Sequence, residues 1–312
     1  MTGPLVALTG ATGFVGRHLL ADLGAHGCRV RVLLRRPSDG APEADSAVIG
    51  DLARPVNMAR ALEGVDAVVH SAGIAHAMSG RPEDDYRGVN TEATIALGRA
   101  AERAGVRRFV FLSSVRAQTG PFAEGVVDES RAPAPTDAYG RSKLAAEEGL
   151  ATLGLDRVAL RPVLVYGPGA KGNMASLVRL AQSPWPLPLG GLRARRSLLP
   201  VESLAAAVRA AIQAEGPLRR PFLVADDGAW TLPEMIAALR HGLGRRPGLV
   251  PVPQAMIALA ARAAGRGEAL DRLTGDLVVD ARALRAIGWT PVVATSEGLA
   301  RLARSAATGG EG

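Results

Sequence analysis

TGATGFVG, residues 9–16, is the segment that decides the fold predicted for this chain of 312 residues. An apolar run at residues 5–8 precedes it and apolar residues at helical spacing follow it, which indicates a strand, a tight turn and a helix. Glycines let the backbone approach a pyrophosphate, whose charge is attracted by the free amides and positive end of the helix. We therefore predict a dinucleotide-binding turn rather than a purely structural one, with cofactor contacts from Gly10, Gly13, Phe14 and Gly16.

Strand and helix patterns continue to alternate as far as residue 161. This alternation predicts an α/β fold, a Rossmann-type doubly wound parallel sheet with helices on both faces. The strands are expected at residues 5–8, 29–34, 48–51, 65–70, 108–112, 158–160 and 222–225. The helices are expected at residues 14–23, 56–62, 85–104, 136–153, 201–214, 232–242, 255–264 and 296–304.

Beyond Tyr166 the pattern changes, because glycines and prolines mark loops and the later segments are mainly helical. We expect a smaller, mainly helical C-terminal lobe that covers the carboxyl edge of the sheet and supplies substrate contacts. The expected division is a dinucleotide-binding domain at 1–166 with 201–226 returning to it, a substrate lobe at 167–200 and 227–306, and a frayed tail at 307–312.

The composition, with 47% hydrophobic residues, is that of a soluble globular protein. The net charge is +7, but the arginines occur in scattered pairs and not in a basic tract with interleaved aromatics, so no nucleic-acid partner is expected. No apolar stretch is long enough for a membrane span, and the first strand follows Met1 too closely for a signal peptide, so we expect a cytoplasmic protein. The single cysteine and the lack of metal-ligand spacing predict neither an internal disulfide nor a metal site.

Arg35 and Arg36 follow the second predicted strand, where dinucleotide sites carry an acid for the ribose hydroxyls or an arginine for a 2′-phosphate. The pair favours NADP(H), with NAD(H) as the other possibility, and a solvent-exposed strand end is the alternative explanation. Ligands of such sheets bind beyond the carboxyl ends of the strands. The other predicted cofactor contacts, at strand ends or in adjoining helices, are Asp51, Leu52, Ser71, Ala72, Gly73, Asn90 and Pro162.

Tyr139 and Lys143 lie one turn apart on the same face of a predicted helix. Of 37 basic residues only two are lysines, which suggests that this position requires a compact ammonium. A phenol has a reference pKa of about 10, and a nearby ammonium and an oxidised nicotinamide favour the phenolate. Ser114, at a strand end, would hydrogen-bond the same substrate oxygen. We predict these three residues to be catalytic, with Tyr139 and Lys143 also at the cofactor; an ordinary pair on a helix surface is the alternative.

These motifs resemble those of the extended short-chain dehydrogenase/reductases, specifically the nucleotide-sugar epimerases, dehydratases and reductases. TGxxGxxG at 9–16, Ser114 and YxxxK at 139–143 carry the resemblance, which extends over nearly the whole chain. Further matching segments are residues 161–162 (RP), 165–169 (VYGPG), 171–173 (KGN), 196–201 (RSLLPV), 275–276 (GD) and 288–289 (GW).

The resemblance implies hydride transfer at carbon 4 of a hexose linked to a nucleoside diphosphate, usually UDP. It implies that Asn173 and Arg196 hold the diphosphate, because arginine forks match phosphate oxygens. Arg272 is a further candidate, although its spacing to Asp276 differs by one residue and a salt bridge would also explain it. A homodimer that pairs the helices at 85–104 and 136–153 is expected on the same grounds.

One departure from the family pattern bears on the reaction type. Dehydratases of this family carry an Asp-Glu pair directly after the catalytic hydroxyl, which removes the proton of carbon 5 and expels a hydroxyl. Val115 and Arg116 occupy those positions here, so dehydration is not expected.

Three functions are compatible with these residues. A 4-epimerase returns the hydride to its substrate and keeps its cofactor, whereas a 4-keto reductase delivers hydride once and releases oxidised cofactor. Arg35 and Arg36 favour NADP(H), which cells hold largely reduced, and this tilts the prediction toward the reductase. Similarity to subgroups acting on UDP-N-acetylated 6-deoxy-4-keto sugars points the same way. A non-catalytic cofactor-binding scaffold or sensor is disfavoured, because the three predicted catalytic residues are all present.

Overall fold

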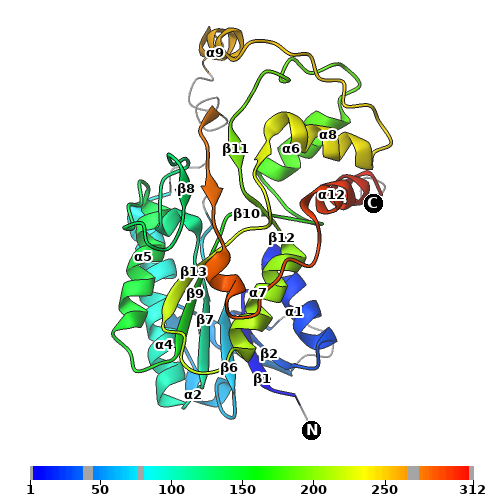
Figure 1. Ribbon diagram of the computed structural model, residues 1–312. Coiled ribbons are helices and arrows are strands. Elements are labelled where there is room, and N and C mark those ends of the chain that lie inside the picture. Colours follow the sequence, from blue (N-terminus) through cyan, green and yellow to red (C-terminus); the bar gives the residue numbers. More distant parts are fainter. Residues whose placement is uncertain (1–2, 38–44, 76–80, 264, 266–273, 309–312) are drawn as a thin grey trace.

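A parallel sheet lies at the centre of the computed structural model, which describes residues 3–37, 45–75, 81–263, 265 and 274–308 (Figure 1). Within these residues the sheet has seven strands in the order β13-β9-β7-β6-β1-β2-β3, and every neighbouring pair is parallel. The predicted Rossmann-type doubly wound fold is confirmed. The strands are β1 (Leu5–Thr9), β2 (Arg29–Leu34), β3 (Asp45–Val48), β6 (Ala67–His70), β7 (Arg108–Leu112), β9 (Arg157–Pro162) and β13 (Arg220–Val224).

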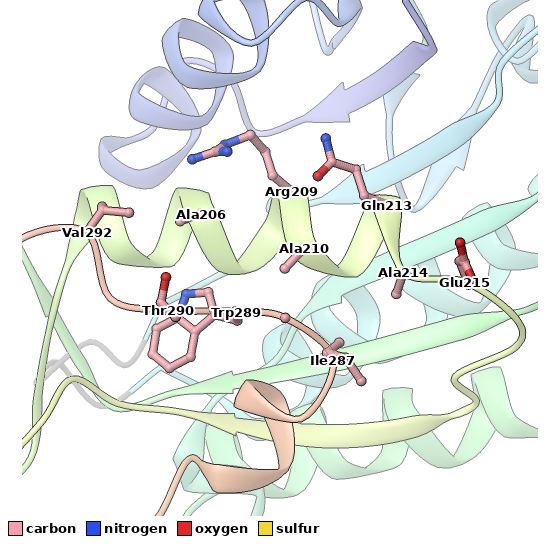
Figure 2. A pocket seen from close by; sticks show the side chains of 11 residues that line it. Ala206, Arg209, Ala210, Gln213, Ala214, Glu215, Ile287, Trp289, Thr290 and Val292 are labelled. Carbon is pink, nitrogen blue, oxygen red and sulfur yellow. The ribbon is translucent and has the colours of Figure 1, made fainter.

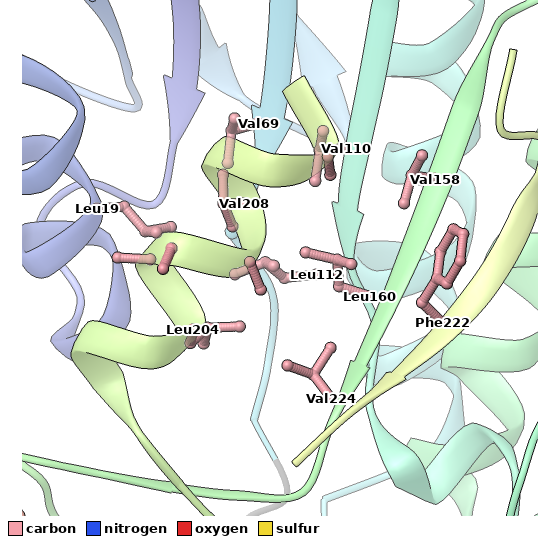
Figure 3. Close-up of a cluster of buried hydrophobic side chains, with 14 of the residues drawn as sticks. Leu19, Val69, Val110, Leu112, Val158, Leu160, Leu204, Val208, Phe222 and Val224 are labelled. Atoms are coloured by element: carbon pink, nitrogen blue, oxygen red, sulfur yellow. The ribbon is translucent and has the colours of Figure 1, made fainter. Parts of the chain in front are cut away.

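Helices cover both faces of the sheet because side chains alternate across each buried strand. In β1, Leu8 faces one apolar cluster and Ala7 faces another. Leu19 and Val208 pack into the first cluster from the helices on that face (Figure 3). That face is covered by α1 (Phe14–Ala25) and α7 (Val201–Gln213), and the other by α2 (Met58–Ala61), α4 (Ala93–Arg103) and α5 (Ala138–Ala151).

The strand order reverses between β1 and β6. From β1 the chain proceeds to β2 and β3 on one side and then crosses back to β6 on the other side. Thr9 ends β1 and His70 ends β6, and these two residues are direct partners in the parallel register. Because doubly wound sheets bind ligands outside such a reversal, the residues that follow these two strands form the expected binding edge.

A mainly helical group lies beyond the carboxyl ends of the central strands (Figure 1). Its helices α6 (Asn173–Gln182), α8 (Leu232–Gly242) and α12 (Thr295–Thr308) surround a third apolar cluster. Short ladders pair β10 (Leu164–Tyr166) with β12 (Leu198–Pro200), β11 (Arg195–Arg196) with β14 (Trp230–Thr231), and β8 (Val126–Val127) with β15 (Val278–Val279). Helix α9 (Gln254–Ala263) lies on the same side of the sheet, whereas α11 (Arg282–Arg285) packs beside β13 of the central sheet. In the described part of the chain, no helix combines the length and apolar character that crossing a membrane requires.

Side-chain caps decide where two of the helices begin. Asp137 precedes α5, and its Oδ1 accepts a hydrogen bond of 2.7 Å from the amide of Gly140. Thr231 and Glu234 form a reciprocal capping box at the start of α8. The cap at Asp137 fixes the start of the helix that carries Tyr139 and Lys143.

The structure differs from the sequence-based prediction at three places. Gly50, with a φ of +72°, turns the chain, so the third sheet strand ends at Val48 and β4 (Gly50–Asp51) pairs antiparallel with β5 (Arg54–Pro55). The helix expected at 85–104 consists of α3 (Glu83–Tyr86), the π-helical segment η1 (Arg87–Glu92) and α4. Helix α12 packs against α8 and runs to Thr308, so residues 307 and 308 of the expected tail are helical. Residues 309–312 lie outside the described residues.

Candidate active site

The glycine turn after β1 leaves no room for side chains. Gly10 has a φ of +74°, and a Cβ added to it would lie 2.7 Å from the amide nitrogen of Ala72. A Cβ on Gly16 would lie 1.9 Å from the carbonyl oxygen of Gly10. The amide of Gly13 donates to the same carbonyl at 2.9 Å. Strand, turn and helix therefore approach one another as closely as backbone allows.

The first turn of α1 offers amide groups that no side chain caps. Gly13 is the N-cap residue, it makes no side-chain hydrogen bond, and the first turn contains no acidic residue. Uncapped amides and the helix dipole together attract a phosphate group. The turn has space that a Cβ at Gly10 or Gly16 would fill, and no carboxylate in the first turn of α1 competes for the amides. This arrangement fits the pyrophosphate of a dinucleotide.

Replacing Gly10 by Ala is expected to abolish cofactor binding and to lower the free energy of unfolding by at least about 1–2 kcal/mol, since the residue is left-handed and its Cβ meets backbone. The measurements are a cofactor titration and urea unfolding. Gly24→Ala is the control, because nothing lies within 4 Å of its added Cβ, and about 0.5–1 kcal/mol of stabilisation is expected there. Undiminished cofactor binding by Gly10→Ala would show that this turn is not the phosphate cradle.

The loop after β6 lies against the glycine turn. The hydroxyl of Ser71 donates to the carbonyl of Thr9 at 2.7 Å, and the amide of Ala72 donates to the Thr9 hydroxyl oxygen at 3.2 Å. A Cβ on Gly73 would lie 2.9 Å from Oδ1 of Asn90 and 3.5 Å from Nζ of Lys143. The structure thus brings together predicted cofactor residues from β1, β6, η1 and α5.

Asn90 joins this loop to α5, which carries the predicted catalytic residues Tyr139 and Lys143. Its Oδ1 accepts from the amide of Ile74 at 2.8 Å, and its Nδ2 donates to the Ile74 carbonyl at 3.0 Å and to Oγ of Ser142 at 3.1 Å. The side chain is buried in the π-helical segment η1, a type of turn that is frequent at functional sites. Asn90 therefore fixes the loop next to the residue that precedes Lys143.

His70 is a buried residue of the site that no sequence motif marked. Its Nδ1 lies 2.7 Å from Oγ1 of Thr9, and its Nε2 lies 2.9 Å from Oγ1 of Thr94. Thr94 donates its own proton to the carbonyl of Asn90, so we assign the proton of the ring to Nε2. Burial, and to a smaller degree the charge of Lys143, lowers the pKa of His70 to about 3. A neutral imidazole therefore holds the end of β1 against η1 and α4.

The Tyr139 phenol and the Ser114 hydroxyl are hydrogen-bonded to each other. Ser114 follows β7, Tyr139 lies in the first turn of α5, and the Tyr86 ring meets the Tyr139 ring edge-on at 6.2 Å. The pKa of Tyr139 is raised to about 12, with burial as the largest cause. The hydrogen bond with Ser114 and the charge of Arg116 act to lower this pKa, whereas Asp137 and Tyr86 act to raise it. These are the two side chains predicted to contact one substrate oxygen.

Lys143 lies one turn after Tyr139 in α5 and is anchored at β7. Its Nζ donates to the carbonyl of Leu112 at 2.8 Å and lies 4.6 Å from the centre of the Phe111 ring. Burial lowers the pKa of Lys143 to about 8, although the charge of Glu147 raises it. The ammonium thus lies beside Gly73, one of the predicted cofactor residues.

A buried ion pair supports α5 one turn beyond Lys143. Nη2 of Arg161 lies 2.6 Å from Oε2 of Glu147, and the two side chains are only 4% and 9% exposed. Ser113 donates to the same carboxylate, and Arg161 also donates to Gln118. Neither Glu147 nor Arg161 was predicted as a site residue, although the spacing of four residues from Lys143 to Glu147 is a signal that could have indicated it.

The remaining predicted cofactor residues follow β2, lie in the β4–β5 hairpin or end β9. Arg35, after β2, pairs with Asp51 at 3.3 Å, and both side chains are largely exposed, so the pair contributes at most about 1 kcal/mol and can rearrange. Arg36 is exposed, whereas Leu52 packs against the second apolar cluster. Pro162 ends β9 beside Val224 of β13.

The residues predicted to hold the substrate lie on different elements. Arg196 is in β11, and its Nη1 donates to the carbonyl of Pro121 at 3.1 Å. Burial and the charge of Arg116 lower the pKa of Arg196, and Asp276 raises it. Asn173 is the exposed first residue of α6. Arg272 lies outside the described residues.

A hollow of about 420 Å³ lies between α7 and residues 287–292 (Figure 2). It is lined by the face of α7 opposite to the one that packs on the sheet, and Arg209 at its edge pairs with Asp22 at 2.7 Å. None of the predicted catalytic, cofactor or substrate residues lines it, so we do not assign the reaction to this hollow.

The sequence profile of the NAD dependent epimerase/dehydratase family matches residues 6–225. The chain is 32% identical over 310 residues to a UDP-glucose 4-epimerase of Vibrio cholerae, covering 96% of this chain and 94% of the relative. It is 30% identical over 293 residues to a ceramide reductase of Caulobacter vibrioides (strain NA1000 / CB15N), covering 92% of this chain and 86% of the relative.

Two solved structures of MoeE5 are similar to this chain. The complex with UDP-glucose and NAD matches with 26% identity and a TM-score of 0.74, and the complex with UDP-glucuronic acid and NAD matches with 25% identity and a TM-score of 0.75. Both matches cover 97% of this chain and 99% of the other.

Proposed function

Because the chain belongs to the NAD-dependent epimerase/dehydratase family, we propose that it is a UDP-sugar 4-epimerase that transfers hydride at carbon 4 of a hexose and retains its NAD. The observation that carries this proposal is the hydrogen-bonded pair of Ser114 and Tyr139, with Lys143 one turn further along α5 and close to Gly73 of the loop that packs on the glycine turn. The relative named as a UDP-glucose 4-epimerase supports the proposal over almost the full length of the chain. The MoeE5 structures contain NAD with either sugar, so they favour neither sugar.

In this proposal Tyr139 takes the proton of the 4-hydroxyl group while Ser114 hydrogen-bonds the same oxygen. Lys143 keeps a positive charge next to the cofactor site, which favours the phenolate. NAD bound at the glycine turn would supply the hydride acceptor for carbon 4. Tyr139 returns the proton when the hydride returns to the opposite face of carbon 4. The substrate is then inverted with no net oxidation.

The experiment is to denature the purified protein, identify any released nicotinamide cofactor, and incubate native protein with UDP-glucose without added cofactor. We expect near-stoichiometric NAD and conversion to UDP-galactose. Protein that releases no cofactor, but oxidises NADPH when given a UDP-4-keto sugar, would replace the epimerase by the reductase. Protein that acts on no UDP-sugar would overturn the proposal.

The second candidate, a 4-keto reductase using NADPH, rests on Arg35 and Arg36. If Arg35 binds a 2′-phosphate, Arg35→Glu is expected to weaken NADPH binding by about 10- to 100-fold, as the loss of a charged hydrogen bond does, and to affect NADH much less. The measurement is a pair of fluorescence titrations with the two cofactors. Arg60→Glu on the exposed part of α2 is the control. Unchanged NADPH binding would leave Arg35 as a surface partner of Asp51.

We also propose the division into a domain of residues 1–166 and 201–226 and a lobe of residues 167–200 and 227–306. The position of β13 in the central sheet and the packing of α7 on that sheet support it. A homodimer through α4 and α5 and a cytoplasmic location complete the proposal. Light scattering after gel filtration tests the dimer.

A further inference from the structure

Arg116 has two buried nitrogens without partners beside the proposed reacting groups. Its Nη2 pairs with the carboxylate of Asp137. Its Nε and Nη1 are buried, and among the described residues neither has a hydrogen-bond partner. Buried N–H groups are nearly always hydrogen-bonded, so such a pair calls for an acceptor from a ligand or a water.

The contacts of Arg116 place it at the reacting end of the site. Its backbone amide donates to Oγ of Ser114 at 3.1 Å. Its ion-pair partner, Asp137, caps the helix two residues before Tyr139. Burial raises the pKa of Tyr139, and the charge of Arg116 is among the effects that lower it.

A second arginine lies close enough to Arg116 for their charges to interact. Arg196 enters from β11, and burial together with the charge of Arg116 lowers its pKa. Asp137 offsets one charge and Asp276 acts on the other, but the free N–H groups of Arg116 have no oxygen to receive them. A guanidinium can only donate hydrogen bonds. An anionic group of the substrate would supply the oxygen acceptors that the N–H groups of Arg116 lack.

We propose that Arg116 binds a carboxylate carried by the sugar, so that the substrate of the proposed 4-epimerase is a UDP-hexuronic acid. This inference rests on the proposed function. In a hexuronic acid the carboxylate is carbon 6, separated from carbon 4 by carbon 5 alone, whereas the diphosphate is attached at carbon 1 across the ring. Arg116, whose backbone amide bonds Oγ of Ser114 and whose guanidinium pairs with the cap residue of the Tyr139 helix, therefore lies on the side of the site that holds carbon 4 and its neighbours. A guanidinium with free N–H groups matches a carboxylate better than the neutral hydroxymethyl group of a hexose.

The test compares wild-type protein with Arg116→Gln on UDP-glucuronate and UDP-glucose, with UDP alone as a binding probe. We expect the wild type to prefer UDP-glucuronate. Arg116→Gln should lower the preference for UDP-glucuronate, measured as the ratio of the kcat/KM values of the two sugars, by about 10- to 100-fold. Because the charge of Arg116 lowers the pKa of Tyr139, turnover of both sugars should also fall, whereas UDP affinity should stay nearly unchanged.

Four results would overturn the inference. Wild-type turnover of UDP-glucose without UDP-glucuronate would reject the carboxylate and leave the epimerase standing. An equal loss of UDP affinity would assign Arg116 to the diphosphate. Equal kinetics of variant and wild type would assign its N–H groups to water. Turnover of neither sugar would overturn the proposed function itself, and the carboxylate assignment with it.

Two further variants separate binding from support of the helix. Asp137→Asn keeps an oxygen to cap α5 and keeps the N–H groups of Arg116, so the preference for UDP-glucuronate should persist. If it instead lowers both turnovers as much as Arg116→Gln does, Arg116 acts only by holding Asp137. Arg141→Gln, on the exposed side of α5 where Arg141 pairs with Glu83, should change neither.

Discussion

Replacing Tyr139 by Phe is expected to lower kcat by about a thousandfold, because in the proposed mechanism the phenol moves the proton. The variant keeps the ring, its burial and its edge-on contact with Tyr86, so the fold of the site is retained. Cofactor affinity should stay unchanged, since the glycine turn and the anchor of Lys143 at Leu112 are untouched. Steady-state conversion of a UDP-sugar and a cofactor titration measure the two quantities.

Tyr86→Phe is the matched control, because it removes the hydroxyl of the neighbouring buried tyrosine and leaves Tyr139 in place. Its turnover should remain close to that of the wild type. An equally large loss in both variants would attribute the effect to packing. Retained turnover in Tyr139→Phe would refute the assignment of the proton-transfer group.

Glu147→Gln is expected to lower the free energy of unfolding by about 3–5 kcal/mol, because it leaves the charge of Arg161 buried without its partner. The urea midpoint should fall while the m value stays constant. The same change removes a charge that raises the pKa of Lys143, so this pKa should fall below about 8. The ammonium is then lost at a lower pH, and the alkaline limb of the kcat profile should move to lower pH.

Glu148→Gln removes the neighbouring carboxylate on the exposed side of α5 and is the control for both measurements. Neither the urea midpoint nor the alkaline limb should change in it. A Glu147→Gln protein as stable as the wild type would mean that Arg161 finds another partner, and an unmoved alkaline limb would separate Lys143 from that limb.

The fold could be predicted because its signals are local. The glycines at 10, 13 and 16 and the periodicity of the adjoining residues identify strand, turn and helix within one short stretch. Strand ends could likewise be assigned to the binding edge, since parallel strands share their direction. The two-residue ladders, such as β11 with β14, were missed because they are too short to show a period of two.

The missed parts of the site are contacts between distant segments. His70 acquires its role from Thr9 and Thr94, which the sheet brings to either side of it. From the sequence, Arg116 is recognisable only as a departure from the dehydratase pattern. Its unpartnered nitrogens depend on how the elements around it pack, namely β7, α5 and β11. The third strand was misplaced because Gly50 permits a reversal that the apolar pattern does not reveal.

The segment between β10 and β12 leaves the binding edge and returns to it at a hydrogen-bonded neighbour, where Leu164 is the register partner of Leu198. The ends of this excursion are fixed side by side, whatever lies between them. Insertions or deletions within residues 167–197 can therefore be absorbed without shifting the register of the seven central strands. Asn173 and Arg196, the proposed diphosphate contacts, lie on this excursion, so these substrate contacts can diverge while the proposed cofactor turn at residues 9–16 stays constant.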